Sequence, residues 1–464
     1  MATDTDFQQL AEEVDGPVLR PTDPGYDAEC FTYNLLTPLR PVVAVGATSP
    51  GDVQAAIRFA ARFGLAVAIR GGGHMQPYTA QDALLVTLDR LSGVTVDVDR
   101  ATARVTGAAR WSEVIDATTP YGLAPMSGSS TTVAVIGYAL GGGQSPIFGR
   151  PHGYASDHVR SFDIVTADAQ LRTVSAEAEP ELFAALRGGK GNFGVVTAME
   201  IALFRVTSVF AGGIYFPASQ IKEVLHTWRD WAARLPKQAT TSVAIQNLPP
   251  IDEYPEVLHG SHVVHVRYAY LGPAATGRAL LEPMRGVGTR LLDTIAQQPY
   301  REAAALHNDP VGPIPYQDRS LGLAALPDEA LETLVGLTGL GSGSLLASIE
   351  LRALGGALDR VPARPDFVPS RGLPYQLFAF GVGDGALIPV LHDQLERLFA
   401  AMRPWADLKH RRMLNFLSPE EALDPHTLSE VYGADNYDRL LAIKQRFDPH
   451  TMFRMNHTVR PRQA

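Results

Sequence analysis

The sequence predicts an α+β protein of two or three lobes, one of them an antiparallel sheet with helices on one side. Three observations predict this fold class. The 464 residues, 45% hydrophobic and 19% charged, are too many for one simple core. Residues 41–70 have the order strand, helix, strand. After residue 205, β-like runs and an amphipathic helix follow one another, at 208–216, 219–236, 240–247, 262–272, 345–354 and 375–382.

The N-terminal part begins with a buried strand at 41–46, "PVVAVG". A helix over 49–64 follows, with Ser49 as its N-cap, Pro50 in its first turn and Gly64 at its end. The β-like run 65–70 leads directly into three glycines. Residues 84–111 alternate apolar and polar side chains as hairpins do. We further expect a short helix at 111–122, two strands around a turn at Asp168, and a final helix in 432–459 that ends near Phe447.

Composition excludes several classes of partner. The formal net charge is −9 and there is no basic block, so neither nucleic acid nor an anionic membrane is expected to bind. Cys30 is the single cysteine, which excludes an internal disulfide and a cysteine metal cluster, and we expect no metal. The first 16 residues are acidic and polar, and no apolar run reaches membrane-spanning length, so we expect a cytoplasmic protein.

Three glycine-rich stretches are the most informative motifs: "RGGGH" at 70–74, "ALGGGQ" at 139–144 and "GGKGNFG" at 188–194. Consecutive glycines expose backbone N–H groups that no side chain covers, which suits a diphosphate. The third stretch matches the pattern GxGxxG, but it follows a helix-like segment and no helix follows it. That context disfavours a nicotinamide-binding fingerprint. Three such stretches favour one extended anionic cofactor over three ordinary turns.

These stretches, with "GYALGGG", "LRGGKGNFGVVT" and the C-terminal "YGADNYDRLLAIKQRFDPHTMFRMN", resemble the FAD-linked oxidases of the berberine bridge enzyme type. That family belongs to the vanillyl-alcohol-oxidase superfamily, with a PCMH-type FAD-binding domain. The resemblance runs from about residue 20 to 460. It implies an FAD-binding domain at 1–206, a substrate-binding domain at 207–412, and a C-terminal segment, 413–464, that returns to the FAD domain.

The resemblance also implies the cofactor site. The family's glycines bind the FAD diphosphate, and the histidine that matches His74 bonds covalently to the flavin 8α-methyl carbon. The alternative for His74 is an ordinary hydrogen-bonded loop histidine. The residues that match cofactor-binding positions are Arg70, Gly71, Gly72, Gly73, His74, Ser130, Gly137, Gly141, Gly142, Gly143, Asn192, Gly194, Val196 and Asn415.

The chain departs from the family pattern at informative positions. Many relatives carry a second flavin link through a cysteine, where this chain has Ser130, so a single histidyl link is implied. Tyr78 and Ala80 stand where glycine and serine are usual. Relatives that oxidise alcohols often carry a tyrosine base before the matching asparagine, but here Met413 occupies that position. A methionine cannot accept a proton.

Another group must then act as the base if one is needed. Ser348, Glu350 and Arg352 share one face of a predicted strand. Glu350 is the first candidate, with Arg352 orienting the substrate. An equal alternative is that Arg352 and Glu350 only pair with each other and have no catalytic role. Further candidates are Tyr375, Tyr316 and His307. We interpret Tyr268, Tyr270, Trp228 and Trp231 as core packing.

The resemblance implies an FAD-dependent oxidoreductase that oxidises a small organic molecule, natural-product-like or sugar-like, with O₂ as the electron acceptor. One alternative is the same fold with atypical chemistry: a cyclisation, or reoxidation of a reduced quinone drug as a resistance protein. Another is a binding protein that sequesters a metabolite or drug. The sequence makes no prediction of oligomeric state.

Overall fold

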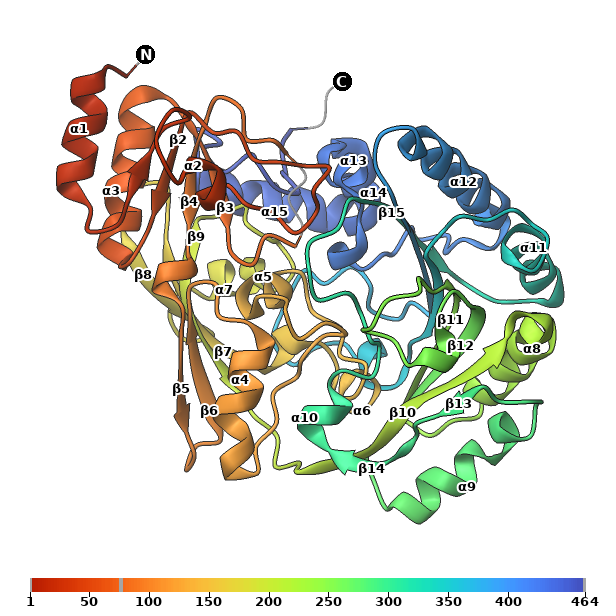
Figure 1. Ribbon diagram of the computed structural model, residues 1–464. Helices are drawn as coiled ribbons and strands as arrows, with labels where there is room; N and C mark the ends of the chain where they lie inside the picture. Colours follow the sequence, from red (N-terminus) through yellow and green to blue (C-terminus); the bar gives the residue numbers. More distant parts are fainter. Residues whose placement is uncertain (1, 75–77, 462–464) are drawn as a thin grey trace.

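The computed structural model describes residues 2–74 and 78–461, and residues 75–77, directly after His74, lie outside the described part. The described strands form three sheets (Figure 1). The first two sheets come from residues 18–202, and the third lies beside them with a layer of helices on its outer side.

The first sheet has the strand order β1-β2-β4-β3, with β1 (Val18–Leu19), β2 (Val43–Gly46), β3 (Ala66–Arg70) and β4 (Ala83–Thr87). Helix α3 (Pro50–Phe63) connects β2 to β3; the Ser49 side chain accepts from the Asp52 N–H, and Gly64 ends the helix at φ +68°. The predicted strand–helix–strand unit is therefore confirmed. Its two strands are not neighbours, because β4 inserts between them and pairs parallel with both.

That insertion corrects one prediction. The alternating stretch 84–111 was expected to form hairpins throughout, but its first strand joins the parallel sheet. Only β5 (Gly93–Asp97) and β6 (Thr102–Thr106) pair as a hairpin. All five residues of β4 are buried, as expected for a strand covered on both faces.

The second sheet is antiparallel, in the order β5-β6-β9-β7-β8, with β7 (Val159–Val165), β8 (Leu171–Ser175) and β9 (Val195–Ala202). The predicted turn at Asp168 joins β7 and β8. Helices α4 (Trp111–Thr118), α5 (Val135–Leu140) and α7 (Pro180–Leu186) pack on this sheet. Trp111, Phe162, Phe183 and Phe193 fill the core between them.

The third sheet contains eight strands and every neighbouring pair is antiparallel. Its main order is β13-β10-β12-β11-β16-β17-β15, and β14 also pairs with β10. The strands are β10 (Ser208–Pro217), β11 (Ala239–Asn247), β12 (His262–Tyr270), β13 (Leu292–Asp293), β14 (Ala296–Pro299), β15 (Tyr316–Leu323), β16 (Ser348–Ala353) and β17 (Tyr375–Val382). Strands β13, β14 and β15 were not predicted from the sequence.

The two faces of this sheet differ in character because successive strand residues point to opposite sides. One face carries Val243, Val266, Leu351 and Leu377 and is covered by α8 (Ile221–Ala232), α9 (Ala274–Arg285), α11 (Asp328–Thr338) and α12 (Leu387–Met402). Trp228 and Trp231 of α8, with Tyr268 and Tyr270, are buried there, as predicted. The opposite face carries charged side chains, including Arg267 and Glu350.

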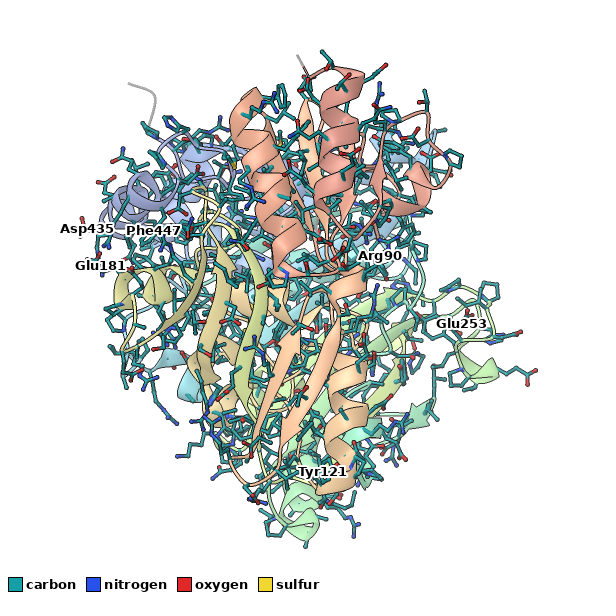
Figure 2. The ribbon with its side chains drawn as sticks, turned by 90° about the vertical axis from the view of Figure 1, so that its left-hand side faces the viewer. Arg90, Tyr121, Glu181, Glu253, Asp435 and Phe447 are labelled. Carbon is teal, nitrogen blue, oxygen red and sulfur yellow. The ribbon has the colours of Figure 1, made fainter. Side chains whose placement is uncertain are left out.

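The chain ends with three helices and a tail. They are α13 (Pro419–Leu423), α14 (Pro425–Tyr432) and α15 (Ala434–Phe447), and α15 ends where the sequence predicts. Arg446 pairs with Glu181 at 3.1 Å, so α15 lies beside α7 (Figure 2). The tail then reaches the first sheet, where the Met452 carbonyl accepts from the Val67 N–H.

The remaining helices are α1 (Asp4–Glu13), α2 (Tyr26–Glu29), α6 (Gly149–His152) and α10 (Tyr300–Ala303). Phe7 of α1 packs against Phe59 of α3, with ring centroids 5.5 Å apart. Within the described residues, no helix is long and apolar enough to cross a membrane.

Candidate functional site

A single cavity brings together the glycine stretches, the polar face of the third sheet and the C-terminal tail. Its walls come from loop 71–74, segment 128–144, loop 190–194, strands β15, β16 and β17, and residues 413–416 and 453–456. These segments are far apart in sequence, and the predicted cofactor and substrate residues meet here.

Loop 71–74 follows β3 and presents backbone to the cavity. Gly71, Gly72 and Gly73 all line the cavity wall. Gly73 has φ +72°, a conformation that favours glycine. A Cβ on Gly72 would lie 3.0 Å from the Ala134 Cβ, so this loop and segment 128–144 are packed backbone to backbone.

Segment 128–144 forms the opposite wall. A Cβ on Gly137 would meet nothing within 4 Å, and Gly137 lines the cavity, so the open space begins at its backbone. A Cβ on Gly141 would instead lie 2.1 Å from the Asn415 Oδ1. Gly143 has φ +75° and packs against the Tyr138 ring. The glycines are thus needed both for access and for close packing.

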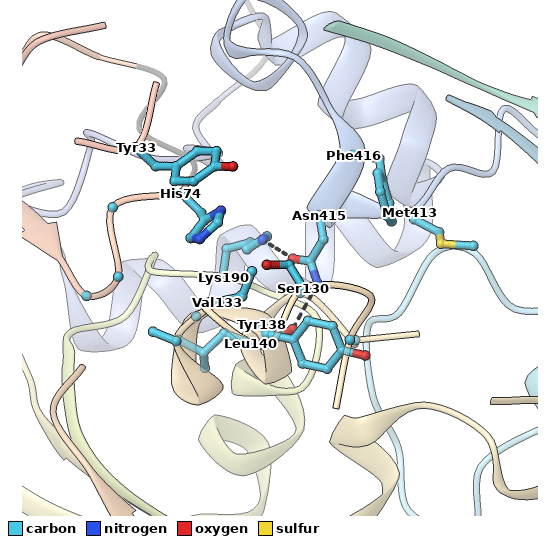
Figure 3. Close-up of a pocket in the computed structure, with 18 of the residues that line it drawn as sticks. Tyr33, His74, Ser130, Val133, Tyr138, Leu140, Lys190, Met413, Asn415 and Phe416 are labelled. Atoms are coloured by element: carbon cyan, nitrogen blue, oxygen red, sulfur yellow. Dashed lines mark hydrogen bonds between the residues drawn. The ribbon is translucent and has the colours of Figure 1, made fainter. Parts of the chain in front are cut away.

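His74 lies at the end of the first loop with its ring held between neighbours (Figure 3). Its Nε2 is 3.2 Å from the Thr132 Oγ1, and Thr132 is in turn 2.8 Å from the Ser130 Oγ. The ring stacks on Tyr33, with centroids 4.0 Å apart. The Tyr316 hydroxyl donates to the His74 carbonyl at 3.1 Å. Burial, with Arg110 nearby, lowers the pKa of His74 to about 4, so the imidazole is neutral at pH 7.

Lys190 places a buried ammonium group in the same cavity. Its Nζ donates to the Asn415 Oδ1, and the Asn415 amide donates to the Tyr138 carbonyl at 2.9 Å (Figure 3). Burial lowers the pKa of Lys190 to about 7. Its backbone has φ +56°, which is uncommon for a residue with a side chain. Such strain is typically retained where the side chain is used.

Glu350 is the centre of an ion-pair network on the polar face of the third sheet. Its Oε1 accepts from Arg267 at 2.9 Å and lies 3.1 Å from the His307 Nε2, while its Oε2 accepts from Arg352 at 2.9 Å. Arg352 also donates to Gln144 at 3.1 Å, which joins this sheet to segment 128–144. Although burial opposes ionisation, the two guanidinium groups and His307 hold the pKa of Glu350 well below its usual range.

This network bears on the predicted base. A carboxylate with a lowered pKa has a weak affinity for a proton, and both Glu350 oxygens are already engaged. The contacts fit a positioning group at least as well as a base. The assignment of Glu350 as the base, with Arg352 orienting the substrate, stays a prediction, and both side chains do line the cavity.

An aromatic wall faces the glycine stretches. Phe378 and Phe380 project from β17 into the cavity, and Phe416 packs against Phe378 with ring centroids 4.9 Å apart. The Arg352 guanidinium lies over the Phe416 ring, 4.6 Å from its centroid. Met413 is buried in the same wall, and its N–H donates to Gln376. The position of the family's tyrosine base is thus apolar.

Some predicted site residues lie outside the cavity lining, and each has a structural contact instead. Arg70 is buried and pairs with Asp89. The Asn192 amide donates to the Gly189 and His457 carbonyls and so ties the tail in place. Gly142 packs against Val368. Tyr375 is on the helix-covered face of β17, because it is odd-numbered on a strand whose even-numbered residues face the cavity. We therefore remove Tyr375 from the candidate catalytic residues.

The other predicted residues line the cavity: Gly71, Gly72, Gly73, His74, Ser130, Gly137, Gly141, Gly143, Gly194, Val196 and Asn415. Of the further candidates, Tyr316 lines it and His307 contacts it through Glu350. Lys190, Asp318 and Tyr33 also line the cavity, and they were not predicted from the sequence. A lysine inside "GGKGNFG" was a usable signal, because it interrupts a run of glycines.

Known proteins resemble this chain over nearly its full length. A family model described as an FAD binding domain matches residues 41–175, and one described as "Berberine and berberine like" matches 415–460. The (R)-6-hydroxynicotine oxidase of Paenarthrobacter nicotinovorans is 27% identical over 471 residues, covering 97% of each chain. The xylooligosaccharide oxidase of Thermothelomyces thermophilus is 26% identical, covering 97% of this chain and 93% of its own.

Solved structures show the same fold. The crystal structure of 6-hydroxy-D-nicotine oxidase from Arthrobacter nicotinovorans superposes with a TM-score of 0.84 at 25% identity, covering 97% of this chain and 98% of its own. The berberine-bridge-like protein 1 of Physcomitrella patens gives 0.83 at 19% identity, with 99% of both chains covered. These likenesses confirm the α+β fold class predicted from the sequence.

Proposed function

We propose that this chain is a berberine bridge enzyme-like FAD-binding oxidoreductase that oxidises a small aromatic molecule, carries its FAD on His74 and passes electrons to O₂. The observation that carries the proposal is the cavity itself. One continuous space is lined by His74, by a wall of aromatic side chains, and by the backbones of Gly71, Gly72, Gly73, Gly137, Gly141 and Gly143.

The cavity residues fit FAD. The glycine stretches offer backbone N–H groups suited to a diphosphate, and Gly137 adjoins open space. Val67, Ile69, Leu88 and Phe453 give the cavity an apolar end for a flat ring. Lys190 supplies a buried amino group that takes up a positive charge near pH 7, and within the described residues no carboxylate forms an ion pair with it.

The environment of His74 supports a covalent link. Attachment requires an imidazole nitrogen with a free lone pair, and the lowered pKa of His74 keeps the ring neutral above about pH 5. Stacking on Tyr33 and the contact with Thr132 fix the ring's orientation. Ser130, two residues from Thr132, lines the cavity but has no thiol, which fits a single link.

Bound FAD would accept the electrons removed from the substrate. The chain's own residues then bind and orient the substrate. Phe378, Phe380 and Phe416 offer flat apolar surfaces to a ring. Arg352, held by Glu350 and Gln144, presents a fixed cation at the edge of these rings. This arrangement favours an aromatic substrate with a polar group.

Oxidation of a sugar is the second candidate. Ser348, Glu350 and Arg352 form a polar row along β16 that lines the cavity, and hydroxyl groups of a sugar would find partners there. A relative named xylooligosaccharide oxidase matches over nearly the whole chain. The aromatic wall leads us to rank this candidate below an aromatic substrate.

A spectroscopic experiment tests the proposal. The purified protein should be yellow, and an aromatic probe such as 6-hydroxynicotine should bleach the flavin without air, with recovery when air is admitted. Xylobiose, tested in the same way, represents the sugar class. Protein that carries no flavin would overturn the proposal. If neither probe reduces the flavin, the result would favour the alternative of a protein that sequesters a metabolite or drug. Product analysis would identify a cyclisation or the reoxidation of a hydroquinone.

Acid precipitation tests the link. The wild-type protein should retain its flavin on the denatured chain, in a single tryptic peptide that contains His74. The variant His74→Ala should release it, whereas Ser130→Ala should retain it. Flavin released from the wild type would contradict the covalent link and leave the rest of the proposal standing.

A further inference from the structure

We propose that Asp318 and the pair Phe378 and Phe380 form a substrate subsite that takes an aromatic amine, with Asp318 binding the amine and accepting its proton. The inference rests on the proposed function, because it assigns the substrate class of that same cavity. Asp318 is an acidic group of the cavity that was not predicted from the sequence.

Asp318 lies on β15, the edge strand of the third sheet, and its side chain lines the cavity. It shares a strand face with Tyr316, whose hydroxyl donates to the His74 carbonyl. Asp318 is therefore one step along the strand from the residue that contacts the cofactor-bearing loop. It is only 3% exposed, so its carboxyl group is removed from bulk water.

The backbone N–H of Asp318 hydrogen-bonds to its own carboxyl group, but one carboxyl oxygen has no protein partner in the described part of the chain. Its Oδ1 is buried without a hydrogen-bond partner among the residues that the structure describes. The adjacent cation, Arg319, bonds to Glu396 at 3.0 Å, to Glu420, and to the backbone carbonyl of Asp318 rather than to its carboxyl. A buried, unpaired acceptor is costly unless a ligand pairs with it.

The surrounding charges keep the carboxyl ready to take a proton. Burial, together with Glu421 and Glu420 of α13, raises the pKa of Asp318 to about 7, while Arg319 and the Asp318 backbone N–H act in the opposite direction. Tyr316, on the same strand, is the other titratable neighbour. Glu421 is itself paired with Arg412. A base works best when its pKa lies near the working pH, which is the situation of Asp318 and not of Glu350.

The sheet register places an aromatic surface beside the acid. Asp318 is directly opposite Phe380 on β17, and Phe380 is directly opposite Ser348 on β16. Phe378 lies in the next row, between Ser320 and Glu350. A ring that lies on Phe378 and Phe380 therefore has Asp318 at one edge and the Glu350–Arg352 network at the other. Only the Asp318 edge is acidic without a paired cation.

The proton step balances within this subsite. A protonated amine approaches the ionised carboxyl, the N–H bond breaks, and the proton bonds to an Asp318 oxygen. The amine keeps the electron pair and becomes neutral, and Asp318 becomes a neutral acid. A neutral amine is the form whose adjacent C–H bond the flavin can oxidise, because its lone pair stabilises the positive charge that develops.

The experiment measures binding of three probes to the flavin-loaded enzyme by calorimetry: benzylamine, benzyl alcohol and benzoate. At pH 8 benzylamine should bind at least about 10-fold more tightly than benzyl alcohol, because a charge-assisted hydrogen bond is the stronger kind. Benzylamine stays protonated below pH 8. Its affinity should therefore fall about 10-fold between pH 8 and pH 6, as Asp318 takes up a proton. Binding at pH 7 should release protons to the buffer.

The variant Asp318→Asn should lose the preference for benzylamine, the pH dependence and the proton release. Asp384→Asn, the same change at an exposed position outside the cavity, is the matched control and should behave as the wild type. Retention of the preference in Asp318→Asn, or tighter binding of benzoate than of benzylamine, would overturn the proposal. If Asp318→Asn does not fold, a flat pH profile in the wild type overturns it equally. A protein that binds the probes in this way but is never reduced would refute the proposed function alone.

Discussion

Burial and neighbouring charges together set the protonation states of three ionisable residues in the cavity, His74, Lys190 and Glu350. His74 is kept neutral, Lys190 is brought to a pKa of about 7, and Glu350 stays ionised because two guanidinium groups outweigh its desolvation. At the scale of single residues, these protonation states suit His74 to attaching a cofactor, Lys190 to changing the reduction potential of that cofactor, and Glu350 to positioning a substrate.

Glu350 gives the first prediction. Glu350→Gln removes the charge that Arg267 and Arg352 share, so we expect the free energy of unfolding to fall by about 3–5 kcal/mol. The folded-state pKa of Glu350 is depressed, so this stabilisation is present above the unfolded pKa and is lost as pH falls through the folded value. Urea titration at pH 7 measures the first effect, and titrations at successively lower pH below the unfolded pKa measure the second.

The control for Glu350 is Glu396→Gln, which removes an exposed partner of Arg319 and should cost no more than about 1 kcal/mol. Unchanged stability, together with flavin reduction slowed by roughly 100- to 10,000-fold, would instead support the prediction that Glu350 is the base.

Lys190 gives the second prediction. A cation in the cavity stabilises the reduced flavin, which is the more negative form, so Lys190→Met should lower the flavin midpoint potential. The loss of one charged interaction of about 1–3 kcal/mol corresponds to roughly 20–60 mV for a two-electron couple. A dye-coupled spectrophotometric titration measures it.

The comparison variant for Lys190 is Lys190→Gly, which removes the charge and also relieves the backbone at φ +56°. It should show the same fall in potential with higher stability than Lys190→Met. A potential unchanged in both variants would show that the ammonium does not influence the flavin.

At the scale of elements, a buried lysine is one of the groups that hold the C-terminal tail. The Lys444 Nζ of α15 donates to the Asn192 carbonyl at 2.7 Å, to the Phe453 carbonyl at 2.9 Å and to Asp448 at 2.9 Å. These bonds connect the tail to loop 188–194. Because Phe453 lines the cavity, the same lysine shapes the cofactor site.

Lys444→Met should therefore lower the free energy of unfolding by about 3–5 kcal/mol, since it leaves Asp448 buried without its cation. Amide exchange should rise over residues 448–459. Arg446→Met, which removes exposed pairs with Glu179 and Glu181 from the same helix, should cost less than about 1 kcal/mol. Similar losses in the two variants would contradict the anchoring role of Lys444.

Elements with clear local signals were predictable from the sequence. Helix α3 has a capping serine and a terminal glycine, and α8 has a regular apolar stripe, so both were found. Strand β15 was missed because "YQDRSLGL" mixes charged and apolar residues and reads as a loop. Its pattern is that of an edge strand facing a polar cavity, which becomes visible only when β17 pairs with it.

The same reason explains what was missed in the site. The glycine stretches and His74 are recognisable from the local sequence, because runs of glycine are rare where no ligand or neighbouring segment needs close access to the backbone. Asp318 and Tyr375 do not, since their roles depend on which face of a strand meets the cavity. That face is decided by register across strands far apart in sequence, and no single stretch contains the information.

At the scale of the whole molecule, the cavity is where the N-terminal sheets meet the third sheet, so the cofactor should hold the two parts together. The proposed link to His74 implies that His74→Ala makes the flavin removable, which allows a test. Ligand that binds only the folded state adds about 2.7 kcal/mol of stability at a free concentration 100 times its Kd. The melting temperature of this variant should therefore rise steadily with added FAD, as one cooperative transition, because both parts of the cavity wall contact the ligand. The wild type should not respond, since the proposed covalent link would leave no empty site for added FAD. The contrary outcome is a melt of His74→Ala with two transitions, of which added FAD shifts only one. It would show that the third sheet does not share the cofactor site. The aromatic wall would then contact the substrate alone.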